Sequence, residues 1–218
     1  MCDRKLFIRG LDRLGVKLEG DQVDNILLYC HELQKWNKRI NLIARNTPAT
    51  EVIEKHFLDS LTLLPVIDQY GGNSATLLDV GTGAGFPGLV LAAALPDLQV
   101  TLVEPRQKRV SFLRHIIRTL QLTNVRLIED RLEQAGLSKH DFTFITSRAV
   151  ADGGRFLAML GDVPGPDTLV IVMQATDDLE QWIQGSQGWQ LVKKRKLQLP
   201  ISGAPRLLSV VRKYPIDP

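Results

Sequence analysis

The fold of this chain is decided by the stretch Leu78-Asp79-Val80-Gly81-Thr82-Gly83-Ala84-Gly85-Phe86-Pro87-Gly88. A short apolar strand over 76–80 leads into a Gly-x-Gly-x-Gly loop, which opens a helix over 87–95. Glycine permits positive φ angles and lets a ligand approach the backbone closely, and the amino end of a helix adds N–H donors and a positive dipole. The stretch therefore predicts a ligand loop at the carboxyl end of the first strand of a parallel sheet.

Downstream of this loop, strand and helix patterns alternate. Further strands are expected at 99–103, 125–128, 142–146 and 169–173, and helices or parts of helices at 106–120, 156–160 and 179–183. Two late strand patterns, 191–199 and 207–214, follow without a helix between them. The alternation predicts a doubly wound α/β fold with a mostly parallel sheet, and the last two strands predict a terminal antiparallel hairpin. By analogy, this is the layout of the class I (Rossmann-like) S-adenosylmethionine-dependent methyltransferases.

Residues 1–72 are expected to form a small N-terminal helical extension, and residues 73–218 the methyltransferase domain. With Asp21 as the expected N-cap, apolar residues recur at helical spacing at Val23, Ile26, Leu27, Cys30 and Leu33. Thr47-Pro48 is typical of an N-cap followed by proline at the first helical position. It predicts a second helix through about Leu64, ending near Pro65.

The composition is that of an ordinary globular protein, with 218 residues, 44% hydrophobic and 23% charged. No stretch approaches the ~18 apolar residues of a membrane span, and the first residues lack the apolar core of a signal peptide, so we expect a cytoplasmic protein. Cys2 and Cys30 form no CxxC pair, and we expect neither a disulfide framework nor a zinc site. Each is interpreted as a bystander or a small core residue. The four histidines lack metal-ligand spacing, and no metal is predicted.

The net charge of +3 is unevenly distributed. Residues 193–218 carry seven Lys or Arg and one acid, residues 104–131 carry seven and three, and residues 132–192 carry three and eight. Basic patches favour a polyanionic partner, but a solvated surface explains them equally well. For the run 193–196, phosphate binding and a charged edge strand that discourages aggregation remain equal alternatives. Phosphate contact is favoured for the helix nearer the ligand crevice, which carries Arg106, Lys108, Arg109, Arg114 and Arg118.

Two acids flank the glycine loop in the expected fold. Asp79 ends the first strand, where methyltransferase loops commonly carry an acid near the methionine moiety. Glu104 ends the second strand, 23 residues after Gly81, close to the ~20 expected of an acid that binds ribose hydroxyls. A solvated acid at a strand end is the alternative for Glu104. The arrangement favours S-adenosylmethionine as cofactor, with contacts at Asp79, Gly81, Thr82, Gly83, Gly85 and Glu104.

A second frame of the same loop is compatible with a nicotinamide-dependent dehydrogenase. Gly83-x-Gly85-x-x-Gly88 matches the dinucleotide fingerprint, and Glu104 is then 21 residues on, so spacing does not decide. Two features favour the methyl donor. Asp79 would place a negative charge near a pyrophosphate, and Pro87 removes one amide from the helix start that would hold that phosphate.

The fourth strand ends in Thr146-Ser147-Arg148-Ala149, where the methyl acceptor meets the donor in this fold. The Asn-Pro-Pro-Tyr sequence of adenine amino methylation is absent, no cysteine follows residue 30 to attack a pyrimidine, and no Lys/Asp/Lys/Glu set for ribose methylation is evident. Guanine N7 fits, because its lone pair is free and methylation removes no proton. Catalysis would then be positioning and desolvation. Arg148 is the candidate to orient guanine or hold the cofactor carboxylate, and a salt bridge at the sheet edge is the alternative.

The chain resembles the bacterial small-subunit (16S) rRNA guanine-N7 methyltransferases, the glucose-inhibited division protein B (RsmG) family. The resemblance rests on Trp36-Asn37-Lys38-Arg39-Ile40-Asn41-Leu42, His56-Phe57-Leu58-Asp59-Ser60-Leu61, the stretch 78–88, Lys108-Arg109-Val110-Ser111-Phe112-Leu113-Arg114 and Ser147-Arg148-Ala149. It implies cofactor contacts at Gly81, Phe86, Leu132, Glu133 and Arg148. It also implies small-subunit rRNA, either free or within a ribosomal particle, as the partner.

The resemblance further gives His56, Asp59 and Ser60 a place near the active site. Without it they would be ordinary packed or polar helix residues. Two positions depart from the family pattern. Gln174 stands where a lysine is common after the fifth strand, which removes a possible RNA phosphate contact, and Glu104 replaces the more usual aspartate.

Two further functions stay open at this point. A methyltransferase of this fold that acts on a non-RNA acceptor would carry an acceptor pocket without basic flanks. A ribosome-assembly or RNA-binding factor would keep the fold and lose turnover, which the glutamine at position 174 makes conceivable. A monomer is favoured.

Overall fold

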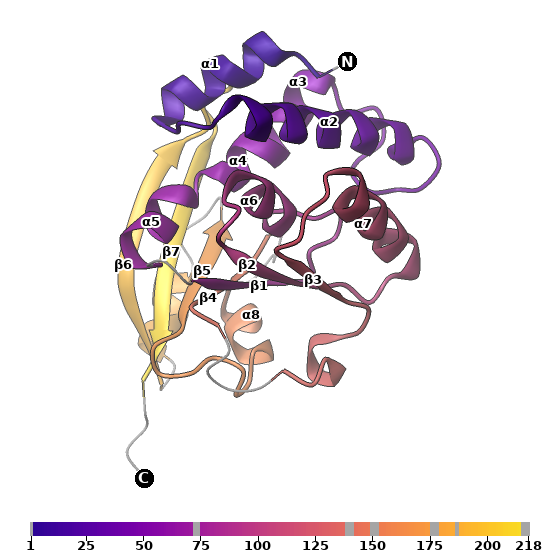
Figure 1. Cartoon of the computed structure of the whole chain (residues 1–218). Helices are drawn as coiled ribbons and strands as arrows, with labels where there is room; N and C mark the ends of the chain where they lie inside the picture. Colours follow the sequence, from indigo (N-terminus) through magenta and orange to yellow (C-terminus); the bar gives the residue numbers. More distant parts are fainter. Residues whose placement is uncertain are drawn as a thin grey trace.

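A computed structural model of the chain describes residues 2–71, 75–137, 142–148, 153–174, 179–185 and 188–214. In this part of the chain a seven-stranded sheet has the order β3-β2-β1-β4-β5-β7-β6 (Figure 1). The strands are β1 Thr76–Val80, β2 Gln99–Val103, β3 Val125–Ile128, β4 Phe144–Ser147, β5 Leu169–Gln174, β6 Trp189–Gln198 and β7 Pro205–Lys213.

Strand directions confirm the predicted fold class. β1, β2, β3, β4 and β5 pair in parallel, whereas β7 runs antiparallel to both β5 and β6. Every residue of β5 is buried, as expected of a strand inside a sheet covered on both faces. The carboxyl ends of β1, β2 and β4 therefore meet at one edge, which is where the ligand loop was predicted.

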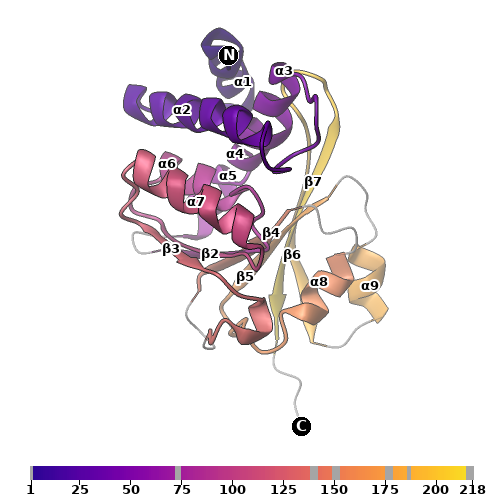
Figure 2. The ribbon, with the colours of Figure 1, turned by 90° about the vertical axis from the view of Figure 1, so that its right-hand side faces the viewer.

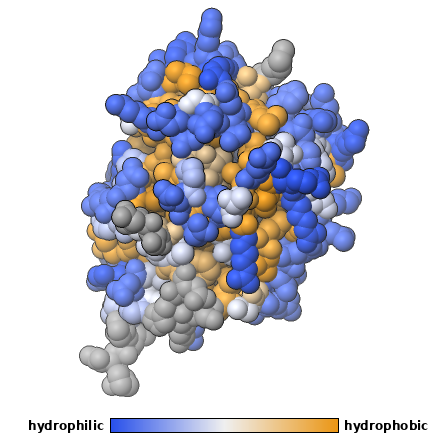
Figure 3. Space-filling model, viewed as in Figure 1, coloured by the Kyte–Doolittle hydropathy of each residue, from blue (hydrophilic) through white to orange (hydrophobic). Residues whose placement is uncertain are grey.

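Helices cover both faces of the sheet. In chain order they are α1 Arg4–Leu14, α2 Gly20–Asn37, α3 Ala49–Val52, the π-helix η1 Ile53–Leu58, α4 Asp59–Leu61, α5 Leu64–Tyr70, α6 Gly88–Ala94, α7 Gln107–Thr119, the 3-10 helix η3 Leu132–Gln134, α8 Gly153–Met159 and α9 Leu179–Gly185. Figure 2 shows α1, α2, α6 and α7 on one side of the sheet and α8 and α9 on the other. Figure 3 shows the surface of the molecule in the view of Figure 1, where hydrophilic and hydrophobic residues are interspersed on the visible face.

The N-terminal helices share a core with the sheet. One hydrophobic cluster contains Phe7 of α1, Ile26 of α2 and Leu77 and Leu102 of the sheet, each fully or almost fully buried. A second cluster lies on the opposite face and includes Ile145. The predicted division between residues 72 and 73 lies outside the described residues and remains a prediction. In the described part, the two segments pack as one continuous hydrophobic interior.

Three helix boundaries differ from the sequence prediction. The N-cap of α3 is Pro48, not Thr47, so the helix begins one residue later than expected. α2 begins with Glu19 as N-cap, not Asp21, because Glu19 and Gln22 form a reciprocal capping box. Pro65 lies in the first turn of α5 instead of ending the preceding helix. A proline is tolerated in the first helical turn because the N–H that it lacks would have no intrahelical acceptor there.

The expectation that the two cysteines form no disulfide is wrong. Cys2 and Cys30 form a disulfide with Cα atoms 6.2 Å apart and a sequence separation of 28. Packing of the chain before α1 against the middle of α2 brings them together, and no local motif reports such a contact. Cys30 is also buried in the core, as its place on the apolar face of the helix predicted. In the described residues, no helix is long and apolar enough to cross a membrane.

Candidate active site

The glycine loop connects β1 to α6 at the carboxyl edge of the sheet. Gly81, Gly83 and Gly85 have φ angles of 64°, 64° and 94°, a region that residues with a side chain rarely adopt. Gly85 is also closely packed, since a Cβ there would overlap the Tyr29 hydroxyl and Leu89. Backbone conformation thus requires glycine throughout the loop, and packing adds a second requirement at Gly85.

Asp79 is a fully buried acid at the end of β1. Its Oδ2 accepts hydrogen bonds from Thr82 Oγ1 at 2.6 Å and from the Gly88 amide at 2.8 Å. Its Oδ1 is buried and has no hydrogen-bond partner among the described residues. Burial raises the pKa of Asp79 to about 6, against the hydrogen bonds that favour the charged form. A buried carboxylate oxygen without a donor is rare, and a ligand ammonium is the kind of group that would satisfy it.

Glu104 lies directly after β2, beside the glycine loop. Its Oε2 accepts from the Gly83 amide and its Oε1 from the Arg106 amide, both at 2.9 Å. The Arg109 guanidinium approaches Oε2 to 3.6 Å. The predicted alternative of a solvated acid does not hold, because Glu104 is only 2% exposed. A carboxylate has about four lone-pair positions, so this one can hold the loop and still accept from two ligand hydroxyls.

Phe86, at the end of the loop, is the centre of an aromatic group. Its buried ring stacks on Tyr29 from α2 and on His56 from η1, with centroid separations of 5.5 and 5.0 Å. The Arg148 guanidinium carbon lies 4.6 Å from the centroid of the same ring, a cation–π arrangement. Tyr29 also donates its hydroxyl hydrogen to the Ala84 carbonyl of the loop. The helical extension therefore supports the glycine loop directly.

Arg148 follows β4 and is fixed by η1. Its Nη1 donates to the Lys55 carbonyl and to His56 Nδ1, both at 2.8 Å. Burial, assisted by the positive charges of Arg148 and Lys55, lowers the pKa of His56 to about 3. His56 is therefore neutral near pH 7, which suits a ring nitrogen that accepts from arginine. This pair can orient a ligand, but His56 does not supply a proton at that pH.

The other two candidates, Asp59 and Ser60, lie in α4 and have structural partners. Asp59 forms a 2.6 Å ion pair with Arg206 of β7, and burial raises the pKa of Asp59 against the opposing effect of Arg206 and Arg148. Ser60 donates its hydroxyl hydrogen to the His56 carbonyl at 2.6 Å. π-helical turns are rare and frequently occur at functional sites. Here the turn presents His56 to Arg148 and Phe86, while Asp59 and Ser60 hold its far end.

Three further positions named from the sequence lie in η3 and at the end of β5. Leu132 and Glu133 form part of η3, which follows β3. Leu132 is buried in the cluster that contains Val80 at the end of β1, whereas Glu133 is exposed. Gln174, which stands where a lysine was expected, is buried at the end of β5.

Sequence reasoning missed Tyr29, Lys55 and Arg206. Tyr29 lies on the apolar face of α2 with Ile26 and Leu33, so periodicity alone identifies it as core. The Lys55 contribution is a backbone carbonyl, which no side-chain pattern reports. Arg206 is 147 residues from its partner Asp59, and only the antiparallel hairpin brings it there.

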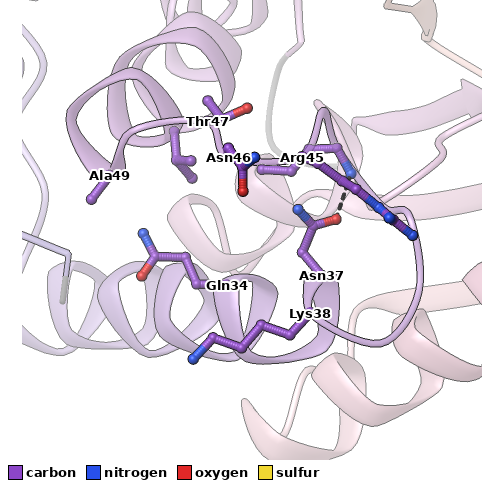
Figure 4. Close-up of a pocket in the computed structure, with 9 residues that line it drawn as sticks. Gln34, Asn37, Lys38, Arg45, Asn46, Thr47 and Ala49 are labelled. Carbon is purple, nitrogen blue, oxygen red and sulfur yellow. Dashed lines mark hydrogen bonds between the residues drawn. The ribbon is translucent and has the colours of Figure 1, made fainter.

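A separate hollow of about 580 Å³ lies between the second half of α2 and the segment 43–52. Figure 4 shows Gln34 and Asn37 of α2 on one side of it and Asn46 and Thr47 on the other. The Asn37 amide oxygen accepts from the Ile43 N–H at 3.0 Å, which fixes the intervening turn. None of the predicted site residues lines this hollow.

The sheet order, together with a Gly-x-Gly-x-Gly loop between two buried acids, defines the class of Rossmann-like S-adenosylmethionine-dependent methyltransferases. Solved structures of this class share the fold. A SAM-dependent methyltransferase from Aquifex aeolicus gives a TM-score of 0.58 at 17% identity over 83% of this chain and 98% of that chain. TYW2 of M. jannaschii, in complex with AdoMet, gives 0.54 at 14% identity over 72% and 77%.

The sequence model of the GidB family, rRNA small subunit methyltransferase G, matches residues 22–209, and the chain belongs to this family. The ribosomal RNA small subunit methyltransferase G of Desulfotalea psychrophila is 42% identical, over 94% of this chain and 95% of its own length. The protein of the same name from Syntrophus aciditrophicus is 36% identical over 96% and 89%. These findings confirm the resemblance seen in the sequence and the predicted enzyme class.

Proposed function

We propose that this chain transfers the methyl group of S-adenosylmethionine to N7 of a guanine in small-subunit (16S) rRNA, in the cytoplasm. The observation that carries the proposal is the pair of buried acids around the glycine loop. Beside them, neutral His56 accepts from the Arg148 guanidinium, which lies against the Phe86 ring. The family relatives, each named a ribosomal RNA small subunit methyltransferase G, support the substrate class.

The acids fit the two polar ends of the methyl donor. Asp79 Oδ1, buried without a donor among the described residues, suits the ammonium of the methionine moiety. Glu104 keeps lone pairs for the ribose hydroxyls while it holds the loop. Gly81, Gly83 and Gly85 leave the backbone open to close approach, with Thr82 fixing Asp79. Phe86, Leu132 and Glu133 complete the proposed contacts.

The acceptor side needs orientation more than acid–base chemistry. The donor, when bound, supplies an electrophilic sulfonium methyl group. Guanine N7 carries a free lone pair, so no residue has to remove a proton. The Arg148 guanidinium has donors beyond those given to Lys55 and His56, and arginine pairs well with guanine O6. His56 fixes Arg148, and Asp59 and Ser60 fix the turn that carries His56.

The test is transfer of labelled methyl from S-adenosylmethionine to small-subunit particles and to naked small-subunit rRNA, followed by nucleoside analysis. Gly81→Arg is the inactive variant: a Cβ at Gly81 would meet no atom within 4 Å, so the new side chain would fill the space over the loop. Gly161→Arg is the matched control, because Gly161 also has a positive φ and open space and lies outside the site.

We expect the wild type and Gly161→Arg to yield label as 7-methylguanine, and Gly81→Arg to yield none. Label on another acceptor would overturn the substrate. Bound donor without label on any RNA would instead favour an assembly factor that has lost turnover.

A further inference from the structure

A basic hollow of about 600 Å³ lies next to the candidate active site. It is formed by the turn that follows α2 and by the first turn of α7, which Figure 1 shows beside each other. Five cationic side chains line it, namely Arg39, Arg45, Arg106, Lys108 and Arg109, and no acid is among its lining residues. We call these five residues and the space between them the basic groove.

The cations of the groove are largely free of protein partners. Arg39, Arg106 and Lys108 are exposed and have no ion pair with any residue that the structure describes. Arg45 donates from Nε to the neutral Asn41 Oδ1 at 2.8 Å. By contrast Arg114, further along α7, pairs with Glu129 at 2.9 Å. Like charges gathered without counter-charges repel one another, and an anionic ligand removes that cost.

The fold, not the sequence, assembles this group. Arg39 and Arg45 come from the turn after α2, more than sixty residues before α7. The amino end of α7 lies at the groove. Its N-cap residue, Arg106, makes no side-chain hydrogen bond to the helix. The cations assigned from the sequence to one helix are therefore divided between two environments. The first turn of α7 belongs to the groove, and Arg114 belongs to an ion pair.

The groove adjoins the proposed donor site through one residue. Arg109 lines the groove and lies 3.6 Å from Glu104, the acid proposed to hold the ribose. A ligand in the groove would consequently lie close to the methyl donor. Five cations spread along the hollow exceed what a single phosphate needs, and they suit an extended chain of regularly spaced anions.

We infer that the basic groove binds consecutive phosphates of the RNA strand next to the target guanine. The inference rests on the proposed function and adds to it the backbone contact that anchors the substrate. Such contacts fix the position of a nucleic acid without reading its sequence. Recognition of the target guanine is then left to the residues around Arg148.

The test compares two charge-neutralised variants of the full chain. Arg39→Gln/Lys108→Gln removes two free cations from the groove. Arg118→Gln/Arg126→Gln removes two exposed cations from the far end of α7 and from β3 and serves as the matched control. The dissociation constant for a small-subunit rRNA fragment is measured at several salt concentrations, together with donor affinity and thermal stability.

The groove variant is expected to bind RNA more weakly at low salt, by about tenfold or more. The magnitude of its slope of log K against log salt should fall by about 1 to 2, because each phosphate contact contributes somewhat less than one to that slope. Donor affinity and thermal stability should match the wild type. The control should keep the wild-type slope. Equal losses in both variants, or an unchanged slope in the groove variant, would overturn the inference.

Methyl transfer by the wild type, measured on the same preparation, separates this inference from the proposed function. If the wild type transfers methyl but the salt slope of the groove variant is unchanged, the proposed function stands and the role of the groove in RNA binding is wrong. If the salt slope falls only in the groove variant and the wild type transfers no methyl, the groove stands as an RNA-binding surface and the proposed function is wrong. Binding of an acidic peptide that outcompetes RNA would overturn the choice of occupant.

Discussion

The two halves of the candidate active site are built in different ways. The donor half, around Asp79 and Glu104, is local, because both acids lie at the ends of neighbouring parallel strands. Glu104 accepts from the Gly83 amide of the glycine loop, and Asp79 accepts from the Gly88 amide at the start of α6. The acceptor half, around His56 and Arg148, is assembled from residues 92 positions apart. A local site can be recognised from spacing, whereas an assembled one depends on how the helical extension packs on the sheet.

The halves also differ in charge. The donor half presents carboxylates, one with an oxygen that lacks a donor among the described residues. The acceptor half presents a guanidinium over an aromatic ring, next to a neutral imidazole. In the proposed complex, negative charge would face the cationic donor, and positive charge would face the electron-rich base. The comparison predicts that changes in the donor half act on donor affinity, and changes in the acceptor half on turnover.

The largest effect is expected from Arg148→Ala. Loss of the guanidinium removes the donors proposed for guanine, and removal of one such group typically lowers turnover about 100- to 1000-fold. Arg148→Lys should restore little, because an ammonium lacks the planar fork and the stacking on Phe86. Single-turnover methyl transfer and equilibrium donor binding measure the two halves separately. A loss of donor affinity as large as the loss of turnover would assign Arg148 to the donor half.

The second effect is expected from Asp79→Asn. A charged hydrogen bond contributes about 1.5–3 kcal/mol, so donor affinity should fall about 10- to 100-fold, with little change in turnover at saturating donor. Calorimetric titration with S-adenosylmethionine measures this. Asp97→Asn is the control, since Asp97 is an exposed acid in the turn before β2. An unaltered affinity in Asp79→Asn would show that Oδ1 does not receive the ammonium.

The sequence predicted the donor half of this site better than the acceptor half. Strand alternation and the glycine loop identified β1 to β7 and placed Asp79 and Glu104, because these are contacts between adjacent strands. The resemblance added His56 but no reason for its role. Arg206 was missed because its partner lies across the hairpin. Neither periodicity nor motif spacing carries information on side chains that meet only through tertiary packing.

A third prediction concerns pH and the donor half. The pKa of Asp79 is raised to about 6 by burial, so the carboxylate is mostly ionised above pH 7 and mostly protonated at pH 5. An ammonium binds the ionised form. Donor affinity should therefore be complete above about pH 7 and fall as the pH drops through 6, by about tenfold at pH 5, since each unit below the pKa reduces the ionised fraction nearly tenfold. Asp79→Asn should show no such dependence.

The smallest effect is expected from Thr82→Val. The Thr82 hydroxyl donates to Asp79 Oδ2 at 2.6 Å and favours the charged carboxylate. Its loss should raise the pKa of Asp79 further, so the pH at which donor affinity declines moves upward, and affinity at pH 7 falls only a few-fold, as expected for one hydrogen bond of about 1 kcal/mol. Thr82→Ser keeps the hydroxyl and should retain the wild-type midpoint. A midpoint that moves equally in both variants would attribute the effect to packing of the methyl group. A shift confined to Thr82→Val would show that a neighbour three residues away sets the charge of the donor half, while the acceptor half continues to depend on contacts that span the chain.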